Sequence, residues 1–305
     1  MEFRRRRPSS QTLDWVERVT GAKVVAWRRM TGGISSVVHR LTIDHGGYRD
    51  VLVLRQYEHT ALDLVDSETA AMIRHEAATL RAVYDAGLPA PEPIAADEEG
   101  RESDGHPSIL MTRVPGRPDI TPADPESWLR QMAAMAARIH EVRFAAQPFR
   151  ARIDAAAPIV PASATRPAVW EAAFGILRQL APEPATRFIH RDFQHFNLLW
   201  QRGRLTGVVD WAMSCTGPAD FDLGHCPLNL AVLFGADRAE RLRLAYEAEA
   251  GRAVDPWWDL YALTAYSDEW RQFIPVQVAG RARLDVAGMT SRVEELLEAT
   301  LGRLA

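Results

Sequence analysis

Two carboxylates and one amide, close together in the sequence, are the residue types that phosphoryl transfer requires. Asp192 and Asn197 come first, and Asp210 follows shortly afterwards. The reaction needs a carboxylate to orient and deprotonate an attacking hydroxyl, and oxygen ligands for a Mg²⁺ that neutralises charge on the β- and γ-phosphates. Mg²⁺ is commonly held by one or two carboxylates or amides plus phosphate oxygens. The pattern favours Asp192 as the base and Asn197 and Asp210 as the metal ligands.

A short hairpin is predicted to position these three side chains. Two apolar segments, Leu198–Trp200 and Leu205–Val209, flank a turn at Gln201–Gly203. Such an arrangement is typical of two short antiparallel strands. Asp192 and Asn197 would then lie on the loop that enters the hairpin and Asp210 at its exit, so that all three meet at one end.

The motif around these residues resembles that of the aminoglycoside phosphotransferase family, small-molecule kinases related in fold to eukaryotic protein kinases. The matching residues are His190-x-Asp192-x-x-x-x-Asn197, Val209-Asp210-Trp211 and Gly217-Pro218-x-x-x-Asp222-Leu223. The resemblance covers nearly the whole chain in the order of its elements. It implies an α+β, two-lobed protein-kinase-like fold, with a small antiparallel sheet and one helix before a larger, mainly helical lobe.

The resemblance also implies roles for residues outside this motif. His190 would brace the catalytic loop through hydrogen bonds to backbone groups. The remaining residues would bind ATP or GTP. Gly33 and Ser35 would belong to a glycine turn over the phosphates, and Arg55 would be the cation on the third strand with Glu76 as its acidic partner. The backbone at Thr112 and Val114 would form the hinge that pairs with the adenine edge. Glu68 competes with Glu76 as the partner of the cation.

Arg55 departs from the family pattern, which usually has lysine at this position. Lys23 is the only lysine in the chain and lies on an earlier predicted strand, so no lysine can take the role. Arginine keeps the charge and binds phosphate bidentately, but its planar fork is not equivalent to an ammonium group. Two interpretations therefore stay open, an active kinase and a catalytically weak or silent nucleotide-binding homologue.

The lobes are expected at residues 1–112 and 113–305, from the order of the predicted elements. In the first, strands are predicted at 24–28, 37–43, 50–55 and 108–111, with helices at 12–19 and about 68–86. The longer helix has an apolar stripe of Ile73, Ala77, Leu80 and Tyr84. In the second, Asp124-Pro125 is typical of a helix start. An irregular connection is predicted at 144–168, and further helices at 237–250, 256–274 and about 284–303.

The phosphate acceptor is not determined by the sequence. The resemblance implies an acceptor pocket in the helical lobe, between the catalytic loop and the C-terminal helices. Asp268 and Glu269, with Tyr266 and Trp270, would form one helical stripe there and suit a cationic acceptor such as an aminoglycoside. The same residues are equally typical of a solvated helix face. The nine tryptophans could instead line a broad apolar pocket for a macrolide-like scaffold. We expect a small hydroxylated molecule as partner, and a monomer or dimer.

Composition disfavours several other classes of protein. The net charge of −4 provides no general cationic field for a nucleic acid. Two cysteines, Cys215 and Cys226, are too few for a disulfide framework, so a reducing, cytoplasmic location is expected. The chain has no run of about 18 apolar residues that would predict a membrane span, and no apolar stretch follows Arg4–Arg7 as in a secretory signal. A metal-dependent hydrolase, suggested by the spacing of His190, Asp192 and His195, would need further histidines nearby. A protein kinase is disfavoured because no activation segment is recognisable after Asp210.

Overall fold

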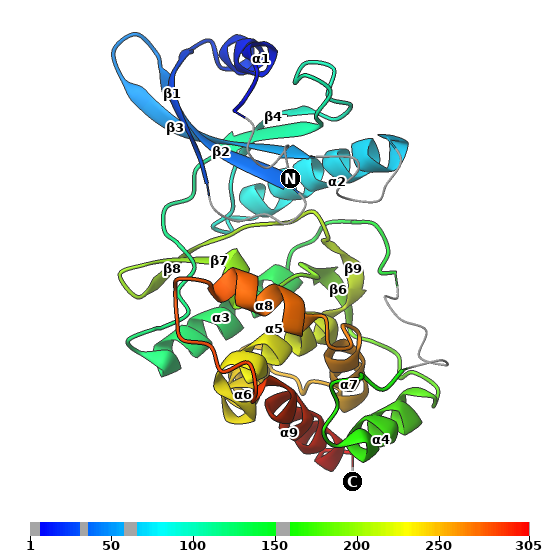
Figure 1. The fold of residues 1–305 in the computed structure, drawn as a ribbon. Coiled ribbons are helices and arrows are strands. Elements are labelled where there is room, and N and C mark those ends of the chain that lie inside the picture. The colour runs from blue at the N-terminus through cyan, green and yellow to red at the C-terminus, as the bar shows by residue number, and fades with distance from the viewer. Residues whose placement is uncertain (1–6, 31–35, 58–65, 151–158, 305) are drawn as a thin grey trace. The chain divides into compact units, whose positions relative to one another are not determined.

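A computed structural model describes residues 7–30, 36–57, 66–150 and 159–304. The chain forms two compact units, Met1–Pro115 and Gly116–Ala305. The division falls after Pro115, whereas the sequence places it after residue 112. We call these the N-terminal unit and the C-terminal unit and describe each by itself (Figure 1).

An antiparallel sheet forms the N-terminal unit, with strand order β1-β2-β3-β5-β4. Its strands are β1 (Lys23–Arg29), β2 (Ser36–Asp44), β3 (Arg49–Tyr57), β4 (Pro93–Asp97) and β5 (Ser108–Thr112). The helix α1 (Ser10–Thr20) places Trp15 and Val16 against Leu41 and Leu54 of the sheet. Burial alternates along β2 because successive side chains point to opposite faces of a strand. The predicted antiparallel sheet is confirmed.

Helix α2 (Asp66–Asp85) packs against β4 and β5. Ile73 and Leu80 of its predicted stripe are buried, but Tyr84 is 41% exposed and Val83 is buried in its place. Burial therefore follows the spacing 73, 76, 80 and 83, which is one face of an α-helix. Because Glu76 lies on this face, α2 carries a buried carboxylate toward the sheet.

Helix α5 (Ala219–Phe234) is the centre of the C-terminal unit. It contacts helices on several sides and is buried from Ala219 to Val232. A Cβ atom added at Gly224 would lie 2.2 Å from the Cβ of Ala262, so the two helix backbones approach closely there. The sequence analysis did not identify α5, since a helix buried all round has no polar face to produce a periodic pattern. The other helices described in this unit are α3 (Pro125–His140), α4 (Pro167–Leu177), α6 (Ala236–Ala250), α7 (Pro256–Thr264), α8 (Trp270–Val278) and α9 (Met289–Gly302).

Short antiparallel strand pairs accompany these helices. One pair is β6 (Thr186–Ile189) with β9 (Cys215–Pro218), and the other is the predicted hairpin, β7 (Leu198–Gln201) with β8 (Arg204–Val208). Strand β6 is in contact with α5, and β8 is in contact with α3. Arg202 and Gly203 form the hairpin turn with positive φ angles of 52° and 73°.

The single helix predicted at 256–274 is wrong. The helix α7 ends at Thr264 and α8 begins at Trp270, and Ser267 between them has a φ of +46° that an α-helix does not accommodate. The start of α9 at Met289 also lies beyond the expected residue 284. Asp255 does cap α7 by accepting a hydrogen bond from the Trp257 N–H.

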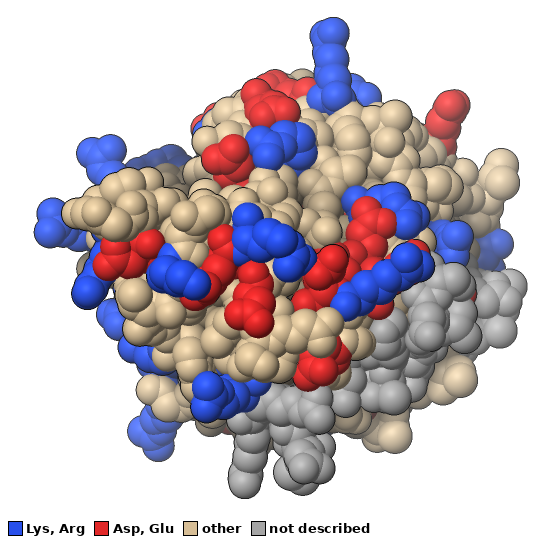
Figure 2. Space-filling view, turned by 90° about the horizontal axis from the view of Figure 1, so that it is seen from above, with Lys and Arg blue, Asp and Glu red and all other residues tan. Residues whose placement is uncertain are grey.

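Exposed charges of both signs are interspersed on the face that Figure 2 presents. Ion pairs such as Arg18–Glu102 and Arg101–Glu99 join exposed side chains of the N-terminal unit. Within the described residues, no helix combines the length and the apolar composition required to cross a bilayer.

Glu294 of α9 caps the N-terminus of α4, where Arg166 provides no side-chain cap of its own. Its carboxylate accepts hydrogen bonds from the backbone N–H groups of Thr165 (2.8 Å) and Arg166 (3.0 Å) and from Nε1 of Trp170 (3.1 Å). The side chain is inaccessible to solvent. Burial opposes ionisation, but the hydrogen bonds from Thr165, Arg166 and Trp170 outweigh it and lower the pKa of Glu294.

We predict that Glu294→Gln reduces the free energy of unfolding by about 1.5–3 kcal/mol at pH 7, because hydrogen bonds to a charged acceptor are lost. Since folding lowers this pKa, the stabilisation is present above the pKa of an unfolded glutamate, about 4.3, and is lost as pH falls below it. Urea denaturation of both proteins from pH 7 to pH 3 should show their difference shrinking on acidification. The control is Glu298→Gln, one turn along α9, which removes only the exposed pair with Arg166 and should change stability little. A pH-independent difference would contradict the assignment.

Candidate active site

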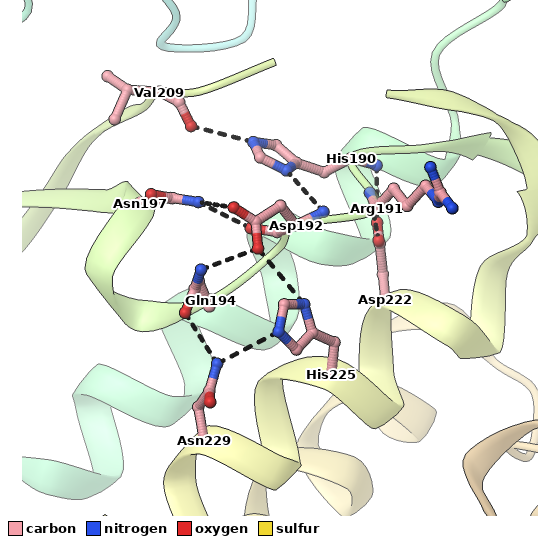
Figure 3. A network of polar contacts seen from close by, with 9 residues as sticks. All are labelled: His190, Arg191, Asp192, Gln194, Asn197, Val209, Asp222, His225 and Asn229. Carbon is pink, nitrogen blue, oxygen red and sulfur yellow. Dashed lines mark hydrogen bonds and ion pairs between the residues drawn. The ribbon is translucent and has the colours of Figure 1, made fainter. Parts of the chain in front are cut away.

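Asp192 and Asn197 lie side by side at the entry to the hairpin (Figure 3). Nδ2 of Asn197 donates to Oδ2 of Asp192 and to its backbone oxygen, both at 2.9 Å. The Val209 N–H donates to the Asn197 carbonyl at 3.0 Å, which closes the neck of the hairpin. Asp210, the next residue, is therefore at the same end, and its charge acts on Asp192.

The carboxyl group of Asp192 has a perturbed pKa. Its side chain retains 29% exposure, so a ligand can reach it. Burial raises the pKa of Asp192 to about 7, the negative charge of Asp210 adds to this effect, and hydrogen bonds from Asn197 and Gln194 oppose it. A carboxylate whose pKa lies near neutral pH suits general-base chemistry.

Both ring nitrogens of His190 bond to backbone groups of this site. The Asp192 N–H donates to Nδ1 at 3.3 Å, and Nε2 lies 3.1 Å from the Val209 carbonyl oxygen. Because an N–H can only donate and a carbonyl can only accept, the proton must be on Nε2. Burial lowers the pKa of His190, which keeps the ring neutral. His190 thus connects residues 190–197, which we call the catalytic loop for the role that the sequence predicts, to the end of the hairpin.

Asp222 holds the backbone of the catalytic loop, a contact that the sequence analysis did not predict. Its Oδ2 accepts from the His190 N–H at 2.8 Å and its Oδ1 from the Arg191 N–H at 2.6 Å. Arg191 has a φ of +67°, which costs a non-glycine residue about 1–2 kcal/mol. Oδ2 also lies 3.2 Å from Nε2 of His140, whose Nδ1 lies 2.8 Å from the Tyr246 hydroxyl. Asp222 stands in the motif quoted above, but nothing in that motif shows which groups it contacts.

In the N-terminal unit, Arg55 and Glu76 form a buried ion pair. Nη1 of Arg55 lies 2.7 Å from Oε1 of Glu76, and Nε of Arg55 donates to Oγ of Ser36 at 3.0 Å. The Tyr57 hydroxyl donates to Glu76, and the Tyr57 ring lies 4.8 Å from the guanidinium carbon. Glu76 is 1% exposed, whereas the competing Glu68 is exposed. Tyr57 and Ser36 are contacts of this cation that the sequence analysis missed.

The structure describes two of the four other residues predicted to bind nucleotide, Thr112 and Val114. Gly33 and Ser35 lie outside the described residues. The Thr112 N–H donates to the Glu92 carbonyl at 2.9 Å, so a ligand could use that N–H only by breaking this bond. Val114 follows β5 in an irregular segment and is half-buried.

The predicted acceptor residues lie in the turn between α7 and α8, not on one helical stripe. Asp268 is half-buried, Glu269 is exposed and precedes α8, and Trp270 is fully buried with its Nε1 donating to the Ser267 carbonyl. Trp270 therefore belongs to the core. Tyr266 stacks on His225, with ring centroids 4.4 Å apart.

The oxygen groups at the hairpin neck fit a magnesium ion. Nδ2 of Asn197 makes both of its hydrogen bonds to Asp192, and no described group donates to Oδ1, which leaves that oxygen for a cation. Asp210 adds a carboxylate. Mg²⁺ completes its coordination with water and phosphate oxygens, so this donor set suffices.

The residues do not suit the dinuclear site of a metallohydrolase. Among the described residues, no three His, Cys, Asp or Glu side chains group as metal ligands. His190 uses both ring nitrogens for backbone contacts. His195 is fully buried, packs against Trp128 and Phe234, and burial lowers its pKa to about 3.

Comparison with known proteins identifies the family. The model of the phosphotransferase enzyme family matches residues 26–266, so the chain belongs to that family. This confirms the resemblance found in the sequence. The comparison with curated proteins found no significant match.

Solved structures of antibiotic kinases share the fold. A putative aminoglycoside phosphotransferase from Ralstonia eutropha is 16% identical with a TM-score of 0.62, covering 97% of this chain and 98% of that chain. Aminoglycoside phosphotransferase APH(4)-Ia, in a ternary complex with ADP and hygromycin B, is 17% identical with a TM-score of 0.60, covering 96% and 98%. Macrolide 2′-phosphotransferase from Brachybacterium faecium is 17% identical with a TM-score of 0.57, covering 95% and 97%. The protein therefore has the kinase-like α+β fold of aminoglycoside phosphotransferases, as the sequence predicted.

We predict that Asp222→Asn loosens the catalytic loop. The amide has one acceptor oxygen, so it cannot satisfy both the His190 and the Arg191 N–H, at a cost of about 1–3 kcal/mol for the group left unpaired. Hydrogen exchange followed by mass spectrometry should show faster exchange in the peptide that covers 188–197. In the matched control, Asp220→Asn disrupts contacts with Arg252 and Asp255 and should leave exchange at 188–197 unchanged. Unchanged exchange in Asp222→Asn would contradict the role of this carboxylate.

Proposed function

We propose that the protein transfers the γ-phosphoryl group of ATP or GTP to a hydroxyl of a small molecule. The observation that carries the proposal is the Asn197 amide: it bonds to the Asp192 carboxylate and directs its own oxygen away from it. The Asn197 side chain thus contacts the candidate base through its amide nitrogen and is itself a candidate metal ligand through its amide oxygen. Family membership supports the same reaction class.

In the proposed mechanism, Asp192 accepts a hydrogen bond from the acceptor hydroxyl and aligns it for attack. As the hydroxyl oxygen bonds to the γ-phosphorus, the bond to the β-phosphate oxygen breaks and the hydroxyl proton passes to Asp192. Asn197 and Asp210 would hold Mg²⁺, which when bound supplies positive charge to the phosphate oxygens. His190 keeps the loop backbone in place through its two ring nitrogens.

Arg55 would bind the α- and β-phosphates in place of the usual lysine. Its contacts with Glu76, Ser36 and Tyr57 fix the side chain before any ligand arrives, which reduces the entropy lost on binding. A silent nucleotide-binding protein is the second candidate, because an arginine stands where the family usually has a lysine and the two are not equivalent. Nucleotide binding would also involve Gly33, Ser35, Thr112 and Val114 in the proposal.

The acceptor is proposed as a hydroxylated small molecule such as an antibiotic. Solved relatives of the same fold include complexes with hygromycin B and with spectinomycin. Asp268 and Glu269 would suit a cationic acceptor, and the turn that carries them contacts His225 through Tyr266. A cytoplasmic location and a monomer or dimer complete the proposal.

We predict that Asp192→Asn lowers kcat by about 10²–10⁴-fold, since the amide cannot accept a proton. Its affinity for the nucleotide should be unchanged. Asp210→Asn serves as the matched substitution: it should weaken magnesium–nucleotide binding by at least about tenfold, because loss even of an indirect metal partner can have that effect. Coupled-enzyme kinetics over a panel of hydroxylated antibiotics and metabolites, with calorimetry of nucleotide binding, separates the two effects. Full turnover by Asp192→Asn would refute the base.

Substitutions at Arg55 should separate an active kinase from a silent one. For an active kinase we predict that Arg55→Lys retains turnover, since lysine also binds phosphate as a point charge, whereas Arg55→Gln loses at least about tenfold in nucleotide affinity, or 1.4 kcal/mol. Arg49→Gln on the same strand is the control, because that side chain is 69% exposed. Melting temperatures identify variants that fail through instability. If wild type and Arg55→Lys both bind nucleotide but consume none with any acceptor, the silent interpretation replaces the kinase.

A further inference from the structure

Three buried polar side chains, drawn below Asp192 in Figure 3, form a ring of contacts with its carboxylate. Nε2 of Gln194 donates to Oδ1 of Asp192 at 2.8 Å, and Nδ1 of His225 lies 3.5 Å from the same oxygen. Nδ2 of Asn229 donates to Oε1 of Gln194 at 2.8 Å and lies 3.4 Å from Nε2 of His225. Gln194 is 5% exposed, His225 2% and Asn229 0%.

We propose that this ring orients the Asp192 carboxylate, and that His225 and Asn229 of α5 are positioning residues for phosphoryl transfer. The inference rests on the proposed function, because it takes Asp192 as the base. It adds residues that lie far from the catalytic motif in the sequence and that the motif does not name.

The direction of every contact in the ring follows from the carboxylate. Oδ1 of Asp192 can only accept when ionised, so Gln194 must present its NH₂ group to it. Oε1 of Gln194 and the bare Nε2 of His225 then both accept, and the NH₂ group of Asn229 supplies its two hydrogens to them. Because the Asn229 NH₂ group can only donate, a neutral His225 ring carries its proton on Nδ1, which lies 3.5 Å from Oδ1 of Asp192.

The two carboxylate oxygens of Asp192 have different neighbours. Gln194 donates to Oδ1 and the His225 ring lies 3.5 Å from it, whereas among the described residues Asn197 alone contacts Oδ2. Oδ1 thus lies between two side chains of the ring, and we assign Oδ2, which has a single neighbour, as the atom that receives the hydroxyl proton.

The ring is held by rigid elements. His225 and Asn229 are one turn apart on the same face of α5, the most buried helix of the C-terminal unit. The Tyr266 ring stacks on His225 with an interplanar angle of 16°. Displacing a reacting group by about 1 Å can reduce a rate by about 10²-fold, so a fixed carboxylate has a direct effect on turnover.

The first experiment does not depend on activity. Nitrogen-15 NMR of the histidine side chains in the full chain reports which ring nitrogen carries the proton, and a His225→Asn sample identifies the His225 signals. We expect the neutral Nδ1–H form in the wild type, with the Nδ1–H resonance shifted in Asp192→Ala. An Nε2–H tautomer, or signals that do not respond to Asp192→Ala, would overturn the ring even if the protein is an active kinase.

The second experiment compares kcat among variants of the ring. His225→Phe keeps an aromatic ring against Tyr266 but removes the donor, and Asn229→Leu removes the two donated hydrogens. Both should lose about ten- to hundredfold in kcat with unchanged nucleotide KM. His225→Asn, which can place an NH₂ group near the position of Nδ1, should recover most of the loss.

Cys226→Ala is the control for a general disturbance of α5, since Cys226 is a buried neighbour outside the ring. It should retain wild-type kcat whatever its effect on melting temperature. Wild-type kcat in His225→Phe, or a loss in His225→Asn equal to that in His225→Phe, would refute the positioning role. If the wild type transfers no phosphate to any acceptor, the proposed function fails, and the NMR result still decides whether the ring exists.

Discussion

The two hydrogen bonds from the catalytic-loop backbone to Asp222 are the constraint on which the candidate site depends. They hold Arg191 in a left-handed conformation that its side chain disfavours, and this turn sets the direction in which Asp192 leaves the loop. A carboxylate is suited to this task because it offers two acceptor atoms to two adjacent N–H groups. The bonds place the loop on α5, so the loop takes its position from the core of the C-terminal unit.

Helix α5 serves the site at three successive positions on one face. Asp222 holds the backbone, His225 contacts the carboxylate of Asp192, and Asn229 joins His225 to Gln194. Polar groups in such a buried position are costly unless each finds a partner. Their contacts provide partners for the Gln194 amide, Nε2 of His225 and the NH₂ group of Asn229, and they limit the arrangements open to the Asp192 side chain.

The sequence predicted the local features of the site better than the tertiary ones. Asp192, Asn197 and Asp210 could be grouped because a short hairpin joins them, and its apolar segments and turn are readable in order. The contacts of Asp222 and His225 could not be predicted, because α5 is apolar or buried on all sides and gives no periodic signal. The same limit explains two incorrect predictions. Packing of α2 buries Val83 and not the predicted Tyr84. The break of the predicted helix near Ser267 depends on a backbone conformation that no proline or glycine marks.

Gly224 lies between Asp222 and His225 in the sequence, and its backbone approaches Ala262 so closely that no side chain fits there. Because Gly224 has no Cβ atom, α5 can pack this closely against α7. This packing fixes where Asp222 and His225 lie relative to the catalytic loop. A larger residue at position 224 would push α5 away from α7 and would displace the side chains of Asp222 and His225 together.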